Sequence, residues 1–169
     1  MGNIFSWDPE TKKTGVVLEN AGNDNAKTST WLEPFSNGLL FNPINQELYI
    51  CEHGNRGIKA LNSNDQLRQI TKSDWILNSP NDLALQKSTG DIFFTDPFFG
   101  KMTFNANFER GNLDQIPNLA EPGYSGIYRI RDIGPYFSHI LMGHKLWLYR
   151  TLLCVESNHK EQEQVTKVV

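Results

Sequence analysis

Several features that would assign this chain to a familiar class are scarce or absent. It has only two cysteines, Cys51 and Cys154, which can pair once and provide no disulfide framework. No spacing of cysteine and histidine resembles a zinc site. No apolar stretch approaches the length of a membrane span, and residues 1–8 lack the basic start and apolar core of a signal peptide. We therefore expect no membrane partner, a cytoplasmic location, and a small buried thiol at Cys51.

The charge of the chain also does not indicate a strongly charged partner. The chain carries 16 basic and 19 acidic residues, interspersed, for a net charge of −3. No basic stripe points to nucleic acid, and no acidic tail points to a cationic partner. We expect no nucleic-acid partner.

What the sequence does contain is an internal repeat. Residues 37–53 can be laid over residues 81–97 without a gap, so that Asn37 meets Asn81 and Glu52 meets Asp96. Each copy reads Asn, apolar run, polar turn, acidic residue, apolar run, acidic residue. A repeat of this length built from short strands is typical of a β-propeller blade.

The apolar runs of the repeat favour strands over helices. Residues 48–51 and 92–95 are short, rich in aromatic and β-branched side chains, and bounded by turn-forming residues. Because these runs are almost continuously hydrophobic, we expect strands that are covered on both faces.

The rest of each blade can be followed along the chain. The sequence predicts a partial propeller over residues 1–131, which consists of the outer half of an early blade and two further blades. The segments are 4–18 for that outer half, 37–71 for one blade, and 81–131 for the next, with a long insertion at 98–124 that we interpret as a lid or rim loop.

Residues 132–169 do not match the repeat and form a separate tail in this interpretation. Either the tail forms a helix that covers an exposed sheet edge, or it is a read-through, frameshift or alternative-exon end. A closed propeller has at least four blades, so two to three blades cannot close a ring. The open edges could support self-association.

Four segments together resemble the SMP-30/gluconolactonase/LRE-like family, and its gluconolactonase branch in particular. They are residues 36–41, 50–56, 77–83 and 93–97, and the resemblance extends over about residues 3–131. It implies an all-β, six-bladed propeller that uses a divalent cation, Ca²⁺, to hydrolyse a small-molecule lactone of the sugar type.

The resemblance also implies roles for individual residues. Asn81 is the metal ligand that the resemblance implies, whereas spacing alone favours a turn at Asn81 and Asp82 that starts a strand. His53, Arg56 and Asn37 are candidate substrate-binding residues at the same rim, with a solvated loop or a turn as the alternative. For Asp96 we expect a structural role.

The family's remaining ligands and its general-base aspartate fall outside the matching part of this chain. The chain by itself is therefore expected to be an incomplete and inactive enzyme. His139, His144 and His159 lie in the unmatched tail and receive no chemical role. Two alternatives stay open: a non-catalytic propeller module for binding or assembly, and a relative of the phosphotriesterases or strictosidine synthases.

Overall fold

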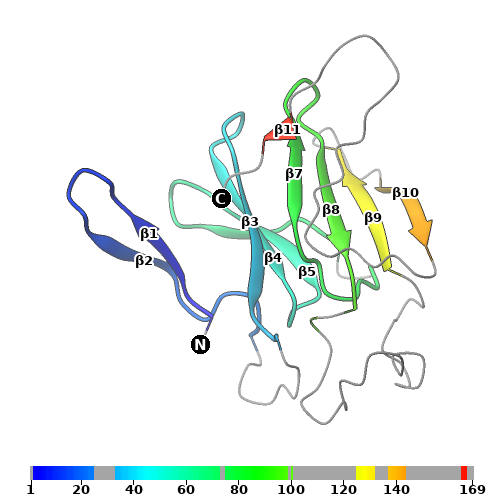
Figure 1. The fold of residues 1–169 in the computed structure, drawn as a ribbon, viewed down its shortest axis with the longest axis horizontal. Helices are drawn as coiled ribbons and strands as arrows, with labels where there is room; N and C mark the ends of the chain where they lie inside the picture. The colour runs from blue at the N-terminus through cyan, green and yellow to red at the C-terminus, as the bar shows by residue number, and fades with distance from the viewer. Residues whose placement is uncertain are drawn as a thin grey trace.

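A computed structural model describes residues 2–24, 33–72, 75–98, 100, 125–131, 137–143 and 165–166. These residues form antiparallel strands joined by turns and loops, with no α-helix among them, which confirms the all-β fold (Figure 1). None of the described segments is a helix that is long and apolar enough to cross a membrane.

The strands form three sheets. The first is a hairpin of β1 (Ile4–Trp7) and β2 (Thr14–Leu18). The second has four strands in sequence order: β3 (Ser36–Asn42), β4 (Glu47–Glu52), β5 (Gly57–Leu61) and β6 (Leu67–Gln69). The third has the order β10-β9-β8-β7-β11 and comprises β7 (Leu83–Gln86), β8 (Ile92–Asp96), β9 (Ser125–Ile130), β10 (Phe137–Gly143) and β11 (Val165–Thr166).

The two copies of the repeat have the same hairpin geometry. Phe41 faces Leu48 across β3 and β4, and the equivalent residues Leu85 and Ile92 face each other across β7 and β8. The turns match as well, because Gln46 N–H donates to the carbonyl of Asn42 (2.9 Å) and Gly90 N–H to that of Gln86 (2.8 Å). Gln46 and Gly90 both have positive φ, at 60° and 76°, a conformation that glycine adopts without steric cost.

Strand β4 is covered on both faces, as its continuous apolar run predicts. Tyr49 and Cys51 face the core that the second sheet shares with the third. Leu48 and Ile50 face the opposite way and pack with residues of the β1–β2 hairpin, including Ile4. The Cys51 thiol is completely buried, and this burial raises its pKa well above the usual value.

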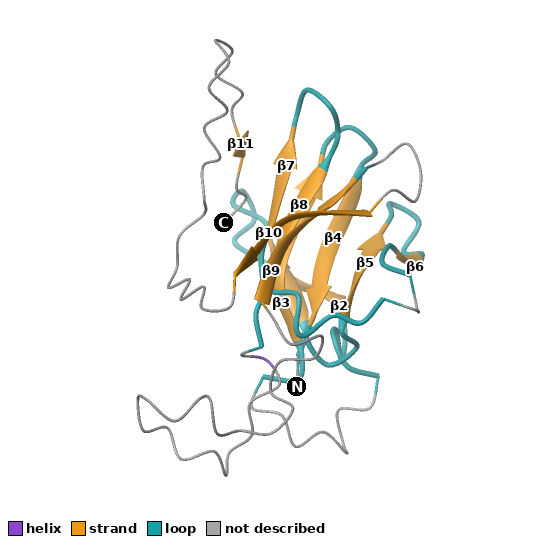
Figure 2. Ribbon diagram, turned by 90° about the vertical axis from the view of Figure 1, so that its right-hand side faces the viewer, coloured by secondary structure: helices purple, strands orange, loops and turns teal. Residues whose placement is uncertain are grey.

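The main core lies between the second and third sheets. Its members from the third sheet include Leu83, Leu85, Ile92, Phe94 and Tyr128. Phe94 stacks on Tyr128 with ring centroids 5.2 Å apart. The alternate residue Phe93 is partly exposed on the other face of β8, where the guanidinium of Arg129 lies 5.8 Å from its ring. Figure 2 shows the strands of the two sheets from the side.

The acidic residues at the start of each second repeat strand both form ion pairs. Glu47 accepts two hydrogen bonds from Arg68, and Asp91 accepts one from Arg129. The hydrogen bond with Arg68 is the main cause of a lowered pKa of Glu47. Each pair therefore satisfies the hydrogen-bonding groups of a buried acidic side chain.

The third sheet continues past Arg131, where the repeat pattern ends. β10 pairs with β9, and the short β11 pairs with β7 on the other side of the sheet. From the sequence we expected either a helix or an unmatched end here. The described parts of the tail, residues 137–143 and 165–166, are strands and not a helix. The exposed edges of β9 and β7 offer unpaired backbone groups to the chain that follows. Of the 98–124 insertion, residues 99 and 101–124 lie outside the described residues, as does Cys154.

Candidate functional site

Asn37 and Asn81, the two asparagines at equivalent repeat positions, meet at one end of the sheets. Asn37 is in β3, and Asn81 comes just before β7; these are the first strands of their sheets and lie next to each other. The side-chain amide of Asn37 donates to Oδ1 of Asn81 at 2.7 Å. The backbone N–H of Gly38 also donates to the carbonyl of Asn81 at 2.7 Å.

Gly38 makes this close approach possible. A Cβ at position 38 would lie 2.5 Å from the carbonyl oxygen of Asn81 and 2.8 Å from Cα of Asp82. Both atoms belong to the backbone and cannot rotate away. The glycine after Asn37 is therefore required by contact between the two first strands, and it brings the two amides together.

His53 completes the cluster from the end of β4. Its side chain is only 2% exposed. Nδ1 lies 3.0 Å from the carbonyl oxygen of Glu33, and Nε2 lies 3.0 Å from Nδ2 of Asn37. A carbonyl oxygen can only accept, so Nδ1 carries the proton and the lone pair of Nε2 faces Asn37.

The environment of His53 favours the neutral ring. Burial lowers its pKa, and this effect outweighs the opposing influence of the Glu33 carbonyl, the Glu33 carboxylate and Asn81. The Glu33 carboxylate is 3.7 Å from Nδ1 but is itself largely exposed, so solvent weakens its attraction. His53 is therefore an uncharged hydrogen-bonding residue near neutral pH.

Gly100 packs against the imidazole ring of His53. A Cβ at Gly100 would overlap both the ring and Cβ of Ser79. The backbone N–H of Gly100 donates to Oγ of Ser79 at 3.0 Å. The ring is thus held by contacts from three parts of the chain.

Asp96 fixes the segment that leads to Asn81. Its carboxylate is fully buried and accepts backbone hydrogen bonds from Asn78 (2.8 and 3.0 Å) and Ser79 (2.8 Å). The N–H of Asn81 then donates to the carbonyl of Thr95 at 2.8 Å. These contacts give Asp96 a structural position, in keeping with the role expected from the sequence.

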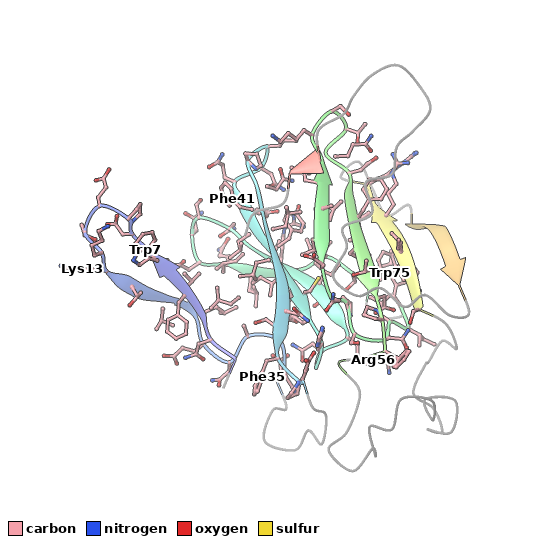
Figure 3. All side chains as sticks on the ribbon, viewed as in Figure 1. Trp7, Lys13, Phe35, Phe41, Arg56 and Trp75 are labelled. Atoms are coloured by element: carbon pink, nitrogen blue, oxygen red, sulfur yellow. The ribbon has the colours of Figure 1, made fainter. Side chains whose placement is uncertain are left out.

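Arg56 is directed to a different part of the chain. Its Nε donates to the carbonyl oxygen of Leu77, which connects the β4–β5 turn to the segment before Asn78. Figure 3 shows Arg56 at the same end of the sheets as Phe35, the residue that precedes β3. The structure thus brings together three of the four predicted site residues, Asn37, His53 and Asn81. A role for Arg56 in substrate binding stays a prediction.

The described residues do not by themselves fit a calcium ion. Calcium takes six to eight oxygen ligands, and among the described residues no group of three or more His, Cys, Asp or Glu side chains is placed to hold a metal. Oδ1 of Asn81 is one oxygen, and it already accepts a hydrogen bond from Asn37. The part of the chain that the structure describes therefore does not make a complete metal site.

Two contributors to the cluster, the Glu33 carbonyl and Gly100, were not predicted from the sequence. The backbone carbonyl of Glu33 determines which nitrogen of His53 carries the proton. Every residue has such a carbonyl, so the residue type at position 33 does not indicate this role. Gly100 packs on His53 from beyond the second repeat. A glycine in a long insertion is a hint of close packing, but nothing in the sequence indicates which side chain it contacts.

The all-β fold and the cluster can now be compared with those of known proteins, and the fold resembles that of propeller-type gluconolactonases. Comparison with solved structures finds a gluconolactonase from Xanthomonas campestris, described as important in glucose secondary metabolic pathways, with a TM-score of 0.59 and 26% identity. A second structure, provisionally named a gluconolactonase, has a TM-score of 0.55 and 18% identity, which shows similarity of fold alone.

Both alignments cover 83% of this chain but only 40% and 41% of the matched structures. The chain thus spans less than half the length of these neighbours. No protein-family model matches the chain, and no curated protein sequence matches it. The chain therefore bears a distant resemblance to the gluconolactonase/SMP-30 group.

Proposed function

We propose that the cluster of Asn37, His53 and Asn81 belongs to the active site of a metal-dependent hydrolase that acts on a sugar-type lactone. One observation carries the proposal: the repeat asparagines and His53 converge at one end of the sheets in a chain that resembles gluconolactonases. Carboxamide groups at a rim suit a ligand that carries several hydroxyl groups, since they both donate and accept hydrogen bonds.

We further propose Ca²⁺ as the cation, with Asn81 as one of its ligands. A carbonyl oxygen has two lone pairs, so the hydrogen bond from Asn37 leaves one lone pair of Oδ1 for a cation. The other ligands then come from groups beyond the described residues. The cluster also contains no carboxylate to activate water, so the general base must come from elsewhere as well.

Since the chain spans about 40% of its structural neighbours, we propose that the 169 residues are inactive alone and that a longer protein carries the complete site. The first test is the intact mass of the protein isolated from its source. A species well above 19.3 kDa supports this part of the proposal. A species of 19.3 kDa that hydrolyses lactone would contradict it.

The second test is turnover of D-glucono-1,5-lactone by that isolated protein, with and without a chelator. We expect Ca²⁺-dependent hydrolysis, and a loss of at least about tenfold in Asn81→Ala, in the range seen when metal sites are disturbed. Asn45→Ala is the control, because Asn45 contacts Glu47 and Tyr49 in the β3–β4 turn rather than the cluster. Equal rates for Asn81→Ala and the unaltered protein would refute the assignment of Asn81.

A second candidate function, as an assembly module, rests on the β1–β2 hairpin. Phe5, Trp7 and Val16 are 62%, 59% and 53% exposed. Phe5 and Val16 face each other across the two strands, and Trp7 follows on the same face of β1. Figure 1 shows the hairpin extending away from the other sheets. Such an exposed apolar face is typical of an interaction surface.

We propose that a second copy or a further blade covers this face. Sedimentation of the 169-residue chain tests self-association: Phe5→Ser with Trp7→Ser should shift an oligomer to monomer. Ile44→Ser is the control, because Ile44 is exposed to a similar extent (56%) but lies in the β3–β4 turn. A chain that is monomeric at all concentrations would exclude association between copies.

A further inference from the structure

Three hydrogen bonds in a row connect Glu33 to Asn81 through the side chains of His53 and Asn37. The distances are 3.0 Å from the Glu33 carbonyl to Nδ1, 3.0 Å from Nε2 to Nδ2 of Asn37, and 2.7 Å from that nitrogen to Oδ1 of Asn81. Every link after the first is made between side chains, so the direction of each bond depends on the bond before it.

That direction follows from which groups can donate. The Glu33 carbonyl accepts, which places the proton of the neutral ring on Nδ1 and a lone pair on Nε2. Only the NH₂ group of Asn37 can donate to that lone pair, so its carbonyl oxygen cannot take this position. The second N–H of Asn37 then requires an acceptor, which is Oδ1 of Asn81.

The same series of hydrogen bonds leaves one polar atom available at the surface of the cluster. Both N–H groups of the Asn37 amide point inward, to His53 and Asn81, and Oδ1 of Asn37 has no hydrogen bond within the described residues. Asn37 is an exposed residue, whereas His53 is buried. The arrangement therefore presents an acceptor oxygen, held in one orientation, at the surface of the cluster.

We propose that His53 is a positioning residue that fixes the orientation of the Asn37 carboxamide, so that Oδ1 of Asn37 accepts a hydrogen bond from a hydroxyl group of the lactone. The proposal rests on the proposed function and predicts a preference for lactones that carry hydroxyl groups over those that do not. Without the lone pair of Nε2 the amide of Asn37 can rotate, and the oriented acceptor is lost.

Two substitutions of His53 separate its two hydrogen bonds. His53→Gln places a carbonyl oxygen near the position of Nε2 and retains an acceptor for Asn37. His53→Asn places an amide N–H near the position of Nδ1 and retains the bond to Glu33, but it has no atom that reaches Asn37. A general loss of packing affects both variants, whereas loss of orientation affects His53→Asn alone.

Two lactones with the same ring size provide the kinetic readout in the protein isolated from its source. D-glucono-1,5-lactone carries hydroxyl groups, and δ-valerolactone does not. We expect His53→Asn to lose about tenfold in kcat/KM on the first lactone, the effect of one hydrogen bond to an oriented partner, and to keep its rate on the second. His53→Gln should stay within about threefold of the unaltered protein on both lactones, because its acceptor bond is retained. Equal losses on both lactones, or none in His53→Asn, would overturn the proposal.

The protonation of the ring gives a readout that does not depend on catalysis. Nitrogen-15 NMR of the histidine rings should show a protonated Nδ1 and an unprotonated Nε2 for His53, and a slowly rotating side-chain amide for Asn37. A proton on Nε2 would overturn the inference. If the unaltered protein hydrolyses neither lactone, the proposed function fails, and the NMR result alone decides whether His53 positions Asn37.

Discussion

The side chain of Asn37 donates a hydrogen bond of 2.7 Å to Oδ1 of Asn81, the residue that occupies the same place 44 positions later in the repeat. Two residues at equivalent positions of the sequence repeat are thus in direct contact in the structure. The reason is that Asn37 lies at the start of β3 and Asn81 just before β7, and these two strands are neighbours. Strands at equivalent positions of adjacent blades place equivalent residues at the same end.

Gly38 should be intolerant of a side chain. In Gly38→Ala, the new Cβ would meet backbone atoms of Asn81 and Asp82 at 2.5 and 2.8 Å, so we expect a loss of about 1–3 kcal/mol in the free energy of unfolding, as for other overpacked sites. Denaturant unfolding measures it. Gly15→Ala is the control, since the closest atom to its Cβ is the Ser6 hydroxyl at 3.2 Å. Equal stability of the two variants would contradict the close approach of β3 and β7.

Asp96 should be required for stability more than exposed aspartates are. Asp96→Asn replaces a fully buried carboxylate that accepts hydrogen bonds from the N–H groups of Asn78 and Ser79. We expect a loss of about 1.5–3 kcal/mol in the free energy of unfolding, the usual contribution of a bond to a charged group. Asp8 also caps backbone N–H groups but is exposed, so Asp8→Asn should change stability little. A stable Asp96→Asn would show that its carboxylate charge is not needed.

The two phenylalanines of β8, Phe93 and Phe94, should differ in their contribution to the stability of the protein. Phe94 is 1% exposed and stacks on Tyr128. Phe94→Ala therefore leaves a cavity in the core and should lower the free energy of unfolding by about 3–5 kcal/mol. Phe93 is partly exposed on the opposite face, and Phe93→Ala should cost less than half as much. Thermal or denaturant unfolding compares them. The reverse order would mean that the register of β8 is shifted by one residue.

The stability of the protein should decrease as the pH falls below about 6.5, partly because of His53. Burial lowers the pKa of His53 in the folded state from its ordinary value of 6.5. Between these two pKa values the unfolded chain binds more protons than the folded one, so protonation favours unfolding. Below the folded pKa the dependence levels off.

Denaturant unfolding at several pH values between 5 and 8 measures this effect. His53→Gln cannot titrate, so its stability should depend less on pH over this interval than that of the unaltered protein. An unchanged pH dependence in His53→Gln would show that His53 has the same pKa in both states.

Much of the fold was predictable from local pattern. The apolar runs at 48–51 and 92–95 became β4 and β8, because short β-branched and aromatic runs between turn formers favour strands. The tail was not predictable in this way. β10 exists as a partner of β9, and pairing with an available edge depends on the rest of the sheet rather than on the tail's own pattern.

The candidate site was likewise predictable in part. The repeat and its motifs indicated Asn37, His53 and Asn81 as residues at a common rim, and the structure brings their side chains into contact. Arg56 belongs to the same motif, yet its guanidinium is bonded to the Leu77 carbonyl. The direction in which a long side chain points depends on neighbours from another sheet, and the sequence motif contains no information on that direction.

The sequence by itself determined the strands, the repeat and the residue types at the rim, because these depend on local conformational preference and on a period that can be counted. Only the tertiary structure decided how the rim residues interact. The proton on Nδ1 of His53 depends on a backbone carbonyl 20 residues away, and the orientation of Asn37 depends on that proton. The direction of a hydrogen bond depends on both groups that packing brings together, so it cannot be inferred from one residue of the sequence.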